Sequence, residues 1–275
     1  MTPTNQPIAV IGSGVAGLSS VAALKKILPC EDIIYCGDNA NVPYSQRSGE
    51  EIVALTRHML DFLRDRQVKV VAIASDTIAS TINSAKCGYY DKSYEFPMVS
   101  IITPTVINIR DKQLREVGVI GTPFTVQSLE LKQQIQAQTP GIQIYTEPVY
   151  NLSKQIEQGD FGSAELVQSV QAPVHALVAQ DPYLVDIVLG CTYAMLIPEL
   201  FSQAAPEVSF INPAHNHAFA VKSLLKAHRL LREDHEGTLQ IYASANLALY
   251  STVLDRMGIK ADEAPFLVNF SPAAQ

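Results

Sequence analysis

Three glycines near the N-terminus have the spacing of a phosphate-binding turn. Gly12, Gly14 and Gly17 spell G-x-G-x-x-G between an apolar run and a helical stretch. In dinucleotide-binding folds such glycines let a pyrophosphate approach a helix N-terminus, and an acidic residue about 20 residues later holds the ribose. Asp38 lies 21 residues after Gly17, but it begins a loop instead of ending the preceding strand. Two interpretations stay open, a bound dinucleotide and a tight turn without a ligand.

The cysteines and histidines indicate neither a metal site nor a disulfide framework. The four cysteines, at positions 30, 36, 87 and 191, lack metal-ligand spacing. We expect Cys36 and Cys87 to be structural and Cys30 to lie in a turn. His215 and His217 are predicted to be solvated loop residues, and because no third ligand accompanies them we predict no metal. Cys191 follows an apolar run, a position at which a cysteine is more often a small buried hydrophobic residue than a nucleophile.

Composition excludes several classes of protein. The chain of 275 residues carries 20 Lys and Arg against 27 Asp and Glu, a net charge of −7, and 47% of it is apolar. We find no cluster of basic residues for nucleic acid. No run reaches the ~18 apolar residues of a membrane span, and the first residues lack the pattern of a signal peptide. We expect a folded protein with reduced thiols in the cytoplasm.

Short apolar strands alternate with helical stretches along the chain. The strand candidates are residues 8–11, 32–36, 68–74, 117–120, 142–145 and 187–189. Residues 50–66 form a helix candidate, in which Ile52, Leu55, Met59 and Phe62 recur at helical spacing. Strands that are apolar nearly throughout and alternate with helices predict parallel sheets covered on both faces.

The sequence also contains an internal duplication. IAVIGSG at 8–14 resembles VGVIGTP at 117–123, and VKVVAIASDT at 68–77 resembles VDIVLGCTYA at 185–194. We predict an α/β fold with two pseudosymmetric Rossmann-like halves around a central cleft, where the strand ends meet a ligand. Residues 87–105 and 212–217 are the predicted crossings between the halves. The first half then comprises residues 1–100 and 212–275, and the second comprises residues 101–211.

Blocks in the same order resemble the glutamate racemase branch of the aspartate/glutamate racemase superfamily. The matching blocks are IAVIGSGVAGL at 8–18, LPCEDIIYCGDNANVPYSQRS at 28–48, VKVVAIASDTIAS at 68–80, VGVIGTPFTV at 117–126, IEQGD at 156–160 and LGCTYAMLIPEL at 189–200. The resemblance implies a cofactor-free enzyme that moves the α-proton of glutamate or a related acidic amino acid. Such activity supplies D-glutamate for peptidoglycan. We expect this small molecule as partner, without nucleic acid or membrane, and leave a homodimer open.

The resemblance also implies a set of site residues. Cys191 matches the second of two catalytic cysteines that face the substrate from opposite sides, and Glu157 matches the acid of the second half. Residues matching substrate-contacting positions are Ser13, Pro43, Tyr44, Ser45, Thr77 and Thr192.

Four positions depart from the family pattern. Gly12 stands where the family has an Asp, and Tyr193 stands where it has a His. Ser75 and Asp76 replace the Cys and Asn of the first catalytic block. An alkanol deprotonates roughly 7 pKa units above a thiol, so ionising Ser75 costs on the order of 10 kcal/mol more than ionising a cysteine. We therefore expect Asp76 to serve as the base on that face, directly or through Ser75.

The departures leave three alternatives to a racemase. A member with one cysteine protonates from one side only, as decarboxylase-like relatives do. A catalytically weakened paralogue keeps the ability to bind an amino acid and acts as a regulator. A dinucleotide-dependent oxidoreductase uses the Gly12-Gly14-Gly17 turn.

Overall fold

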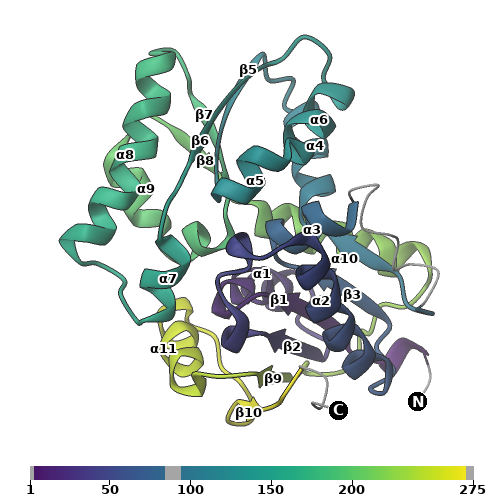
Figure 1. The fold of residues 1–275 in the computed structure, drawn as a ribbon. Helices are drawn as coiled ribbons and strands as arrows, with labels where there is room; N and C mark the ends of the chain where they lie inside the picture. The colour runs from purple at the N-terminus through teal and green to yellow at the C-terminus, as the bar shows by residue number, and fades with distance from the viewer. Residues whose placement is uncertain (1–2, 84–93, 271–275) are drawn as a thin grey trace.

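The computed structural model describes residues 3–83 and 94–270, which form two sheets of parallel strands. The six-stranded sheet has the order β10-β9-β2-β1-β3-β4, and the four-stranded sheet has the order β6-β5-β7-β8. The two sheets lie one above the other in Figure 1. The predicted α/β fold with parallel sheets is confirmed.

The first sheet and the helices near it come from both ends of the chain. Its strands are β1 (Ile8–Gly12), β2 (Ile33–Gly37), β3 (Val70–Ile73), β4 (Met98–Ser100), β9 (Leu239–Ala243) and β10 (Phe266–Leu267). Its helices are α1 (Leu18–Ile27), α2 (Gly49–Arg64), α3 (Asp76–Asn83), α10 (Pro213–Ala227) and α11 (Leu247–Met257). Strands β1, β2 and β3 are buried along their whole length, as their apolar sequences predict.

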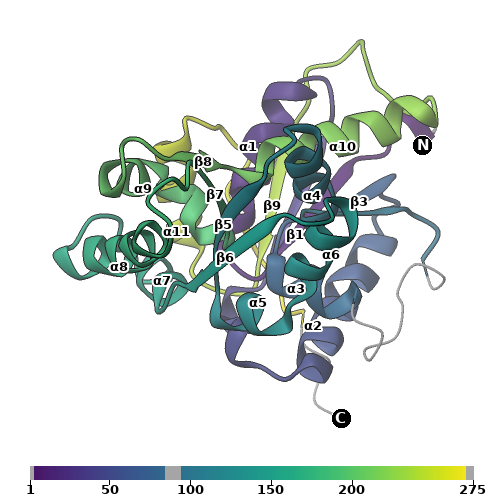
Figure 2. The same cartoon turned by 90° about the horizontal axis from the view of Figure 1, so that it is seen from above.

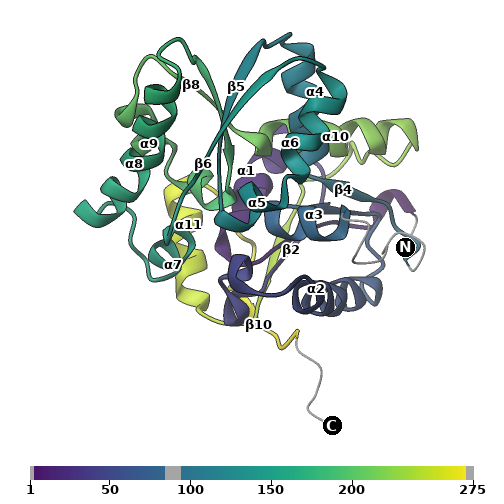
Figure 3. The same ribbon diagram turned by 45° about the horizontal axis from the view of Figure 1, so that its top comes forward.

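The second sheet comes from the middle of the chain. Its strands are β5 (Glu116–Gly121), β6 (Gln143–Pro148), β7 (Asp186–Gly190) and β8 (Ser209–Ile211). The helices here are α4 (Ile102–Asp111), α5 (Pro123–Ser128), α6 (Glu130–Gln138), α7 (Leu152–Glu157), α8 (Ala164–Gln180) and α9 (Pro198–Ala204). Figures 2 and 3 show α8 with α9 on one side of this sheet and α4 with α6 on the other.

Short 3-10 turns follow several strands and bring the two halves together. The turns that matter for the site are η2 (Val15–Gly17), η3 (Asn39–Asn41), η4 (Tyr44–Gln46) and η6 (Thr192–Leu196). Turn η2 packs against η6, and α5 packs against both α3 and η4. Contacts between the halves therefore involve segments that follow β1, β2, β3, β5 and β7.

The two sheets repeat one strand order, since β2-β1-β3-β4 corresponds to β6-β5-β7-β8. Ala9 pairs with Val71 in the first sheet, and Gly118 pairs with Ile187 in the second. Four residues beyond each of these positions lie Ser13, Ser75, Thr122 and Cys191. The strand register thus makes Ser75 the counterpart of Cys191 and Ser13 the counterpart of Thr122.

Both predicted crossings contain regular structure. Within 87–105, the part from residue 94 onwards holds β4 and the start of α4, whereas Cys87 lies outside the described residues. Residues 213–217 begin α10, because Asn212 caps the helix by accepting a hydrogen bond from the Ala214 backbone N–H and Pro213 follows. His217 is therefore not a solvated loop residue. It is fully buried and bonds to Ser20 and the Val99 carbonyl.

In the described part of the chain, no helix has the length and apolar character that crossing a bilayer requires.

Candidate active site

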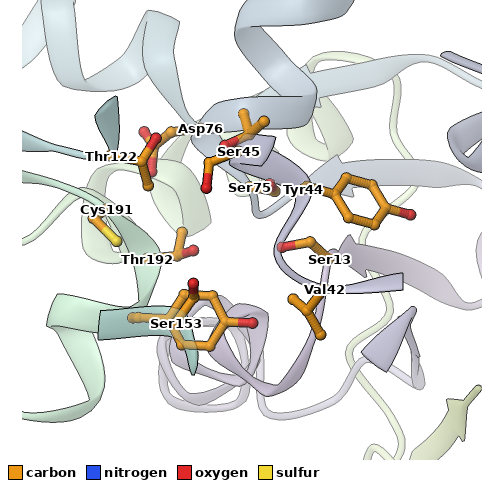
Figure 4. A pocket seen from close by; sticks show the side chains of 12 residues that line it. Ser13, Val42, Tyr44, Ser45, Ser75, Asp76, Thr122, Ser153, Cys191 and Thr192 are labelled. Atoms are coloured by element: carbon orange, nitrogen blue, oxygen red, sulfur yellow. The ribbon is translucent and has the colours of Figure 1, made fainter. Parts of the chain in front are cut away.

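Twelve residues line a cleft at the carboxyl ends of the strands, where the two halves meet. This inner cleft is lined by Ser13, Val42, Tyr44, Ser45, Ser75, Asp76, Thr77, Thr122, Ser153, Cys191, Thr192 and Tyr193. Figure 4 shows that Ser75 and Asp76 reach it from one half and Cys191 and Thr192 from the other. Hydroxyl groups dominate the lining, and Asp76 is the ionisable carboxyl group among these residues.

Cys191 directly follows β7 and is almost fully buried, with 2% of its surface exposed. Burial, and then the negative charge of Asp76, raise the pKa of the Cys191 thiol to about 12. Backbone N–H groups of Tyr193 and Ala194 oppose this shift by donating hydrogen bonds to the sulfur. At neutral pH the group is therefore a protonated thiol, ready to donate its proton.

Asp76 is the first residue of α3 and one of its carboxyl oxygens, Oδ2, is buried without a hydrogen-bond partner among the described residues. Burial raises its pKa to about 7. The hydroxyl of Ser75, by contrast, accepts a hydrogen bond from the Ile78 N–H at 3.3 Å and so caps α3. Of these two residues, Asp76 is therefore the better acid–base catalyst near pH 7. Its Oδ2 atom is not engaged by another described residue, and its pKa lies close to neutral pH.

Glu157 does not line the inner cleft; it lies behind it and joins the two halves. Its Oε1 accepts hydrogen bonds from the Val15 N–H at 2.9 Å and the Tyr193 hydroxyl at 2.7 Å. Its Oε2 accepts one from the Asn39 amide at 2.5 Å. Burial raises the pKa of Glu157, against the effect of these donors. The Tyr193 hydroxyl is thereby connected to the Glu157 carboxyl group.

Asp38 organises the loop that carries Tyr44 and Ser45. Its carboxylate accepts hydrogen bonds from the Tyr44 hydroxyl at 2.7 Å, the Ser244 hydroxyl at 2.7 Å and the Asn41 amide. The Tyr44 ring accordingly points away from the centre of the cleft in Figure 4. Pro43 lines a neighbouring cavity and not the inner cleft.

Three lining residues were missed from the sequence, namely Val42, Thr122 and Ser153. Thr122 carried a usable signal, because the duplicated block places it where the first block has Ser13. Among the described residues, no group of three His, Cys, Asp or Glu is arranged to hold a metal ion.

Comparison with known proteins identifies the family to which this chain belongs. Residues 8–221 match the profile of the Asp/Glu/hydantoin racemase family. The chain belongs to this family. It is 30% identical to a glutamate racemase of Streptococcus sanguinis, over 91% of this chain and 94% of that protein.

Solved racemases share the fold of this family member. The crystal structure of glutamate racemase from Francisella tularensis in complex with D-glutamate superimposes with a TM-score of 0.83 at 28% identity, covering 97% of this chain and 98% of that one. An aspartate racemase from Picrophilus torridus is more distant, with a TM-score of 0.57 at 15% identity, covering 82% of this chain and 99% of that one, and shows the fold alone.

In this racemase-family chain, the glycine-rich turn is not a dinucleotide site. Tyr35 donates a hydrogen bond to the Gly14 carbonyl, and its hydroxyl fills the space next to Gly12 and Gly17. The carboxylate of Asp38 is engaged within its own loop, so it is not available to a ribose. Gly12 and Gly17 leave room for the Tyr35 side chain, and Gly14 leaves room for Glu157 and the Tyr193 hydroxyl. This packing of protein side chains against the turn corrects the dinucleotide alternative.

Proposed function

We propose that the protein moves the α-proton of an acidic amino acid, of the glutamate type, between two faces of one cleft without a cofactor. Asp76 acts on one face and Cys191 on the other. The observation that carries the proposal is a buried carboxyl oxygen of Asp76 that has no hydrogen-bond partner among the described residues and lies in the same cleft as the Cys191 thiol. In the cytoplasm this reaction supplies D-glutamate for peptidoglycan. Residues 1–100 with 212–275, and residues 101–211, are the proposed halves.

The two ionisation ranges assign complementary roles. With a pKa of about 7, Asp76 is largely ionised just above neutral pH and accepts the α-proton of the enantiomer that faces it. With a pKa of about 12, the Cys191 thiol still holds its proton and delivers it to the opposite face of the carbanion. The products are a protonated Asp76, a Cys191 thiolate and the inverted amino acid, and solvent then exchanges the protons.

The remaining lining residues are proposed to hold the substrate's charged groups. Ser13, Ser45, Thr77 and Thr192 offer hydroxyl groups or backbone N–H groups to its carboxylates. Tyr44 and Pro43 shape the loop on the first half. Tyr193 and Glu157 keep the Cys191 side in place, and Ser75 orients the start of α3 through its cap.

Exchange of the α-proton in deuterated water, followed by NMR separately for L- and D-glutamate, tests the proposal. The parent protein should exchange and invert both enantiomers. Asp76→Asn and Cys191→Ala should each abolish inversion, and each should retain slow exchange with one enantiomer, the opposite one in the two variants. Ser75→Ala removes the cap of α3 but neither proton-transfer group, and should change the rates less than either of these variants. The proposal would be contradicted if the parent protein exchanged the α-proton of neither glutamate nor aspartate. It would also be contradicted if both variants lost exchange with the same enantiomer.

A further inference from the structure

A second cavity opens from the inner cleft and contains the positive charge that the cleft lacks. This outer cavity is lined by Pro43, Ser45, Gln46, Thr122, Pro123, Val149, Tyr150, Asn151, Leu152, Ser153, Lys154 and Cys191. It shares Ser45, Thr122, Ser153 and Cys191 with the inner cleft. The two are therefore parts of one continuous opening, lined by η4 of the first half and by α5 and α7 of the second.

The inner cleft is too small to hold a whole amino acid as it stands. It has room for about 20 Å³, close to the space that a single water needs, whereas the outer cavity has room for about 120 Å³. A substrate whose α-carbon lies beside Cys191 therefore extends its side chain most easily into the outer cavity.

The outer cavity has the chemistry of an anion site. Lys154 is the one Lys, Arg or His among the residues that line either space, and it makes no ion pair or hydrogen bond through its ammonium group within the described residues. The amides of Gln46 and Asn151 line the same space. No Asp or Glu does so, although the chain has 27 acidic residues against 20 basic ones.

We propose that Lys154 is a specificity-determining residue that binds the distal carboxylate of the substrate side chain in the outer cavity. This inference rests on the proposed function and adds the residue that recognises the anionic end of the substrate side chain. Lys154 is exposed, so its attraction for the carboxylate is screened by solvent and weakens as the salt concentration rises.

Glutamate and glutamine differ in the charge of the distal group and hardly in shape, so they form the test pair. We expect Lys154→Met to lower kcat/KM for α-proton exchange of glutamate by about three- to tenfold and to leave that of glutamine unchanged. Lys154→Arg should keep most of the preference. Raising the salt concentration from about 0.02 M to about 0.5 M should reduce the parent protein's preference for glutamate over glutamine. The same change should leave the preference of Lys154→Met unaffected.

Lys226→Met is the matched control, because Lys226 is an exposed lysine of α10 that lines neither cavity. This variant should leave kcat/KM unchanged for both glutamate and glutamine. An equal loss for glutamate and glutamine in Lys154→Met, or no loss for either, would overturn the inference. If the parent exchanges neither amino acid, the proposed function fails instead. Calorimetric binding of glutarate, a dicarboxylate without an amino group, then decides on Lys154 alone: weaker binding by Lys154→Met supports its role, and equal binding refutes it.

Discussion

The hydroxyl of Tyr35 occupies the place where a side chain at Gly12 would begin. A Cβ at residue 12 would overlap that oxygen, while its other nearest neighbours, the Gly17 Cα and the Tyr35 Cζ, would be 3.4 Å away. Position 12 is where the family resemblance places an Asp. The missing carboxyl group and the buried tyrosine are therefore two aspects of one packing arrangement.

This arrangement predicts coupling between residues 12 and 35 in folding stability. Gly12→Ala alone should lower the free energy of unfolding by about 1–3 kcal/mol, because the added methyl group overpacks against the Tyr35 hydroxyl. In a Tyr35→Phe background the same change should cost much less, since the remaining contacts are of ordinary length. Urea denaturation of the parent, both single variants and the double variant measures the coupling. Equal costs in the two backgrounds would refute it.

The same geometry determines how the thiol chemistry of the first face is to be rebuilt. Ser75→Cys alone should raise the rate of α-proton exchange little. The new thiol would be buried, and residue 12 is a glycine that supplies no carboxylate to assist it. Gly12→Asp with Ser75→Cys, made in the Tyr35→Phe background, should gain more than the product of the two single effects in that background. Rates of α-proton exchange give the comparison. Gains that simply multiply would show that residues 12 and 75 act independently.

The raised pKa of Asp76 predicts a pH profile for the reaction. A base must be deprotonated, so exchange of the enantiomer that faces Asp76 should rise about tenfold per pH unit below pH 7 and level off above it. The Cys191 thiol adds no step near neutral pH, because its pKa is about 12. Exchange rates at a series of pH values test this. Asp76→Asn should lack the step near pH 7, and a step that persists there must belong to another group.

The same carboxyl group predicts how stability depends on pH. Burial raises its pKa from 3.8, the ordinary value of an aspartate, to about 7 in the folded chain, so between these values the unfolded state loses the proton first. Asp76 therefore lowers the free energy of unfolding as pH rises from about 4 to about 7, by up to a few kcal/mol. Asp76→Asn should remove this fall, and denaturation of both proteins across that range shows the difference. Parallel curves would contradict the assignment.

Glu157 offers a prediction about the contact between the halves. Glu157→Gln should destabilise the fold by about 1–3 kcal/mol, because its new N–H₂ group meets a donor, either the Asn39 amide or the Val15 N–H. Adding Asn39→Asp supplies an acceptor opposite that amide and should recover part of the loss. Asn39 also accepts a hydrogen bond from Tyr250, and Asp in its place keeps that acceptor. Thermal denaturation of the two single variants and the double variant tests this recovery of stability. A double variant less stable than both single variants would rule it out.

The sequence by itself determined the fold class and most of the lining of the cleft. The apolar strands and the duplicated blocks are local patterns, and parallel strands place their carboxyl ends at one edge, so a cleft at that edge was predicted. The family resemblance then assigned Ser13, Ser75, Asp76 and Cys191 to it. The short edge strands β4, β8 and β10, of three, three and two residues, were missed because so few residues carry no period. Asn212 and Pro213 were interpreted as a loop although they begin a helix.

Only the tertiary structure decided which chemical roles these residues can take. Burial gives Asp76 its pKa of about 7, and burial keeps the Cys191 thiol protonated. Glu157 reaches Val15 and Asn39 from far away in the sequence. The Gly-rich turn, ambiguous as a motif, is filled by Tyr35. Desolvation, hydrogen bonding and steric exclusion all depend on which distant residues become neighbours, and that information appears only when the chain has folded.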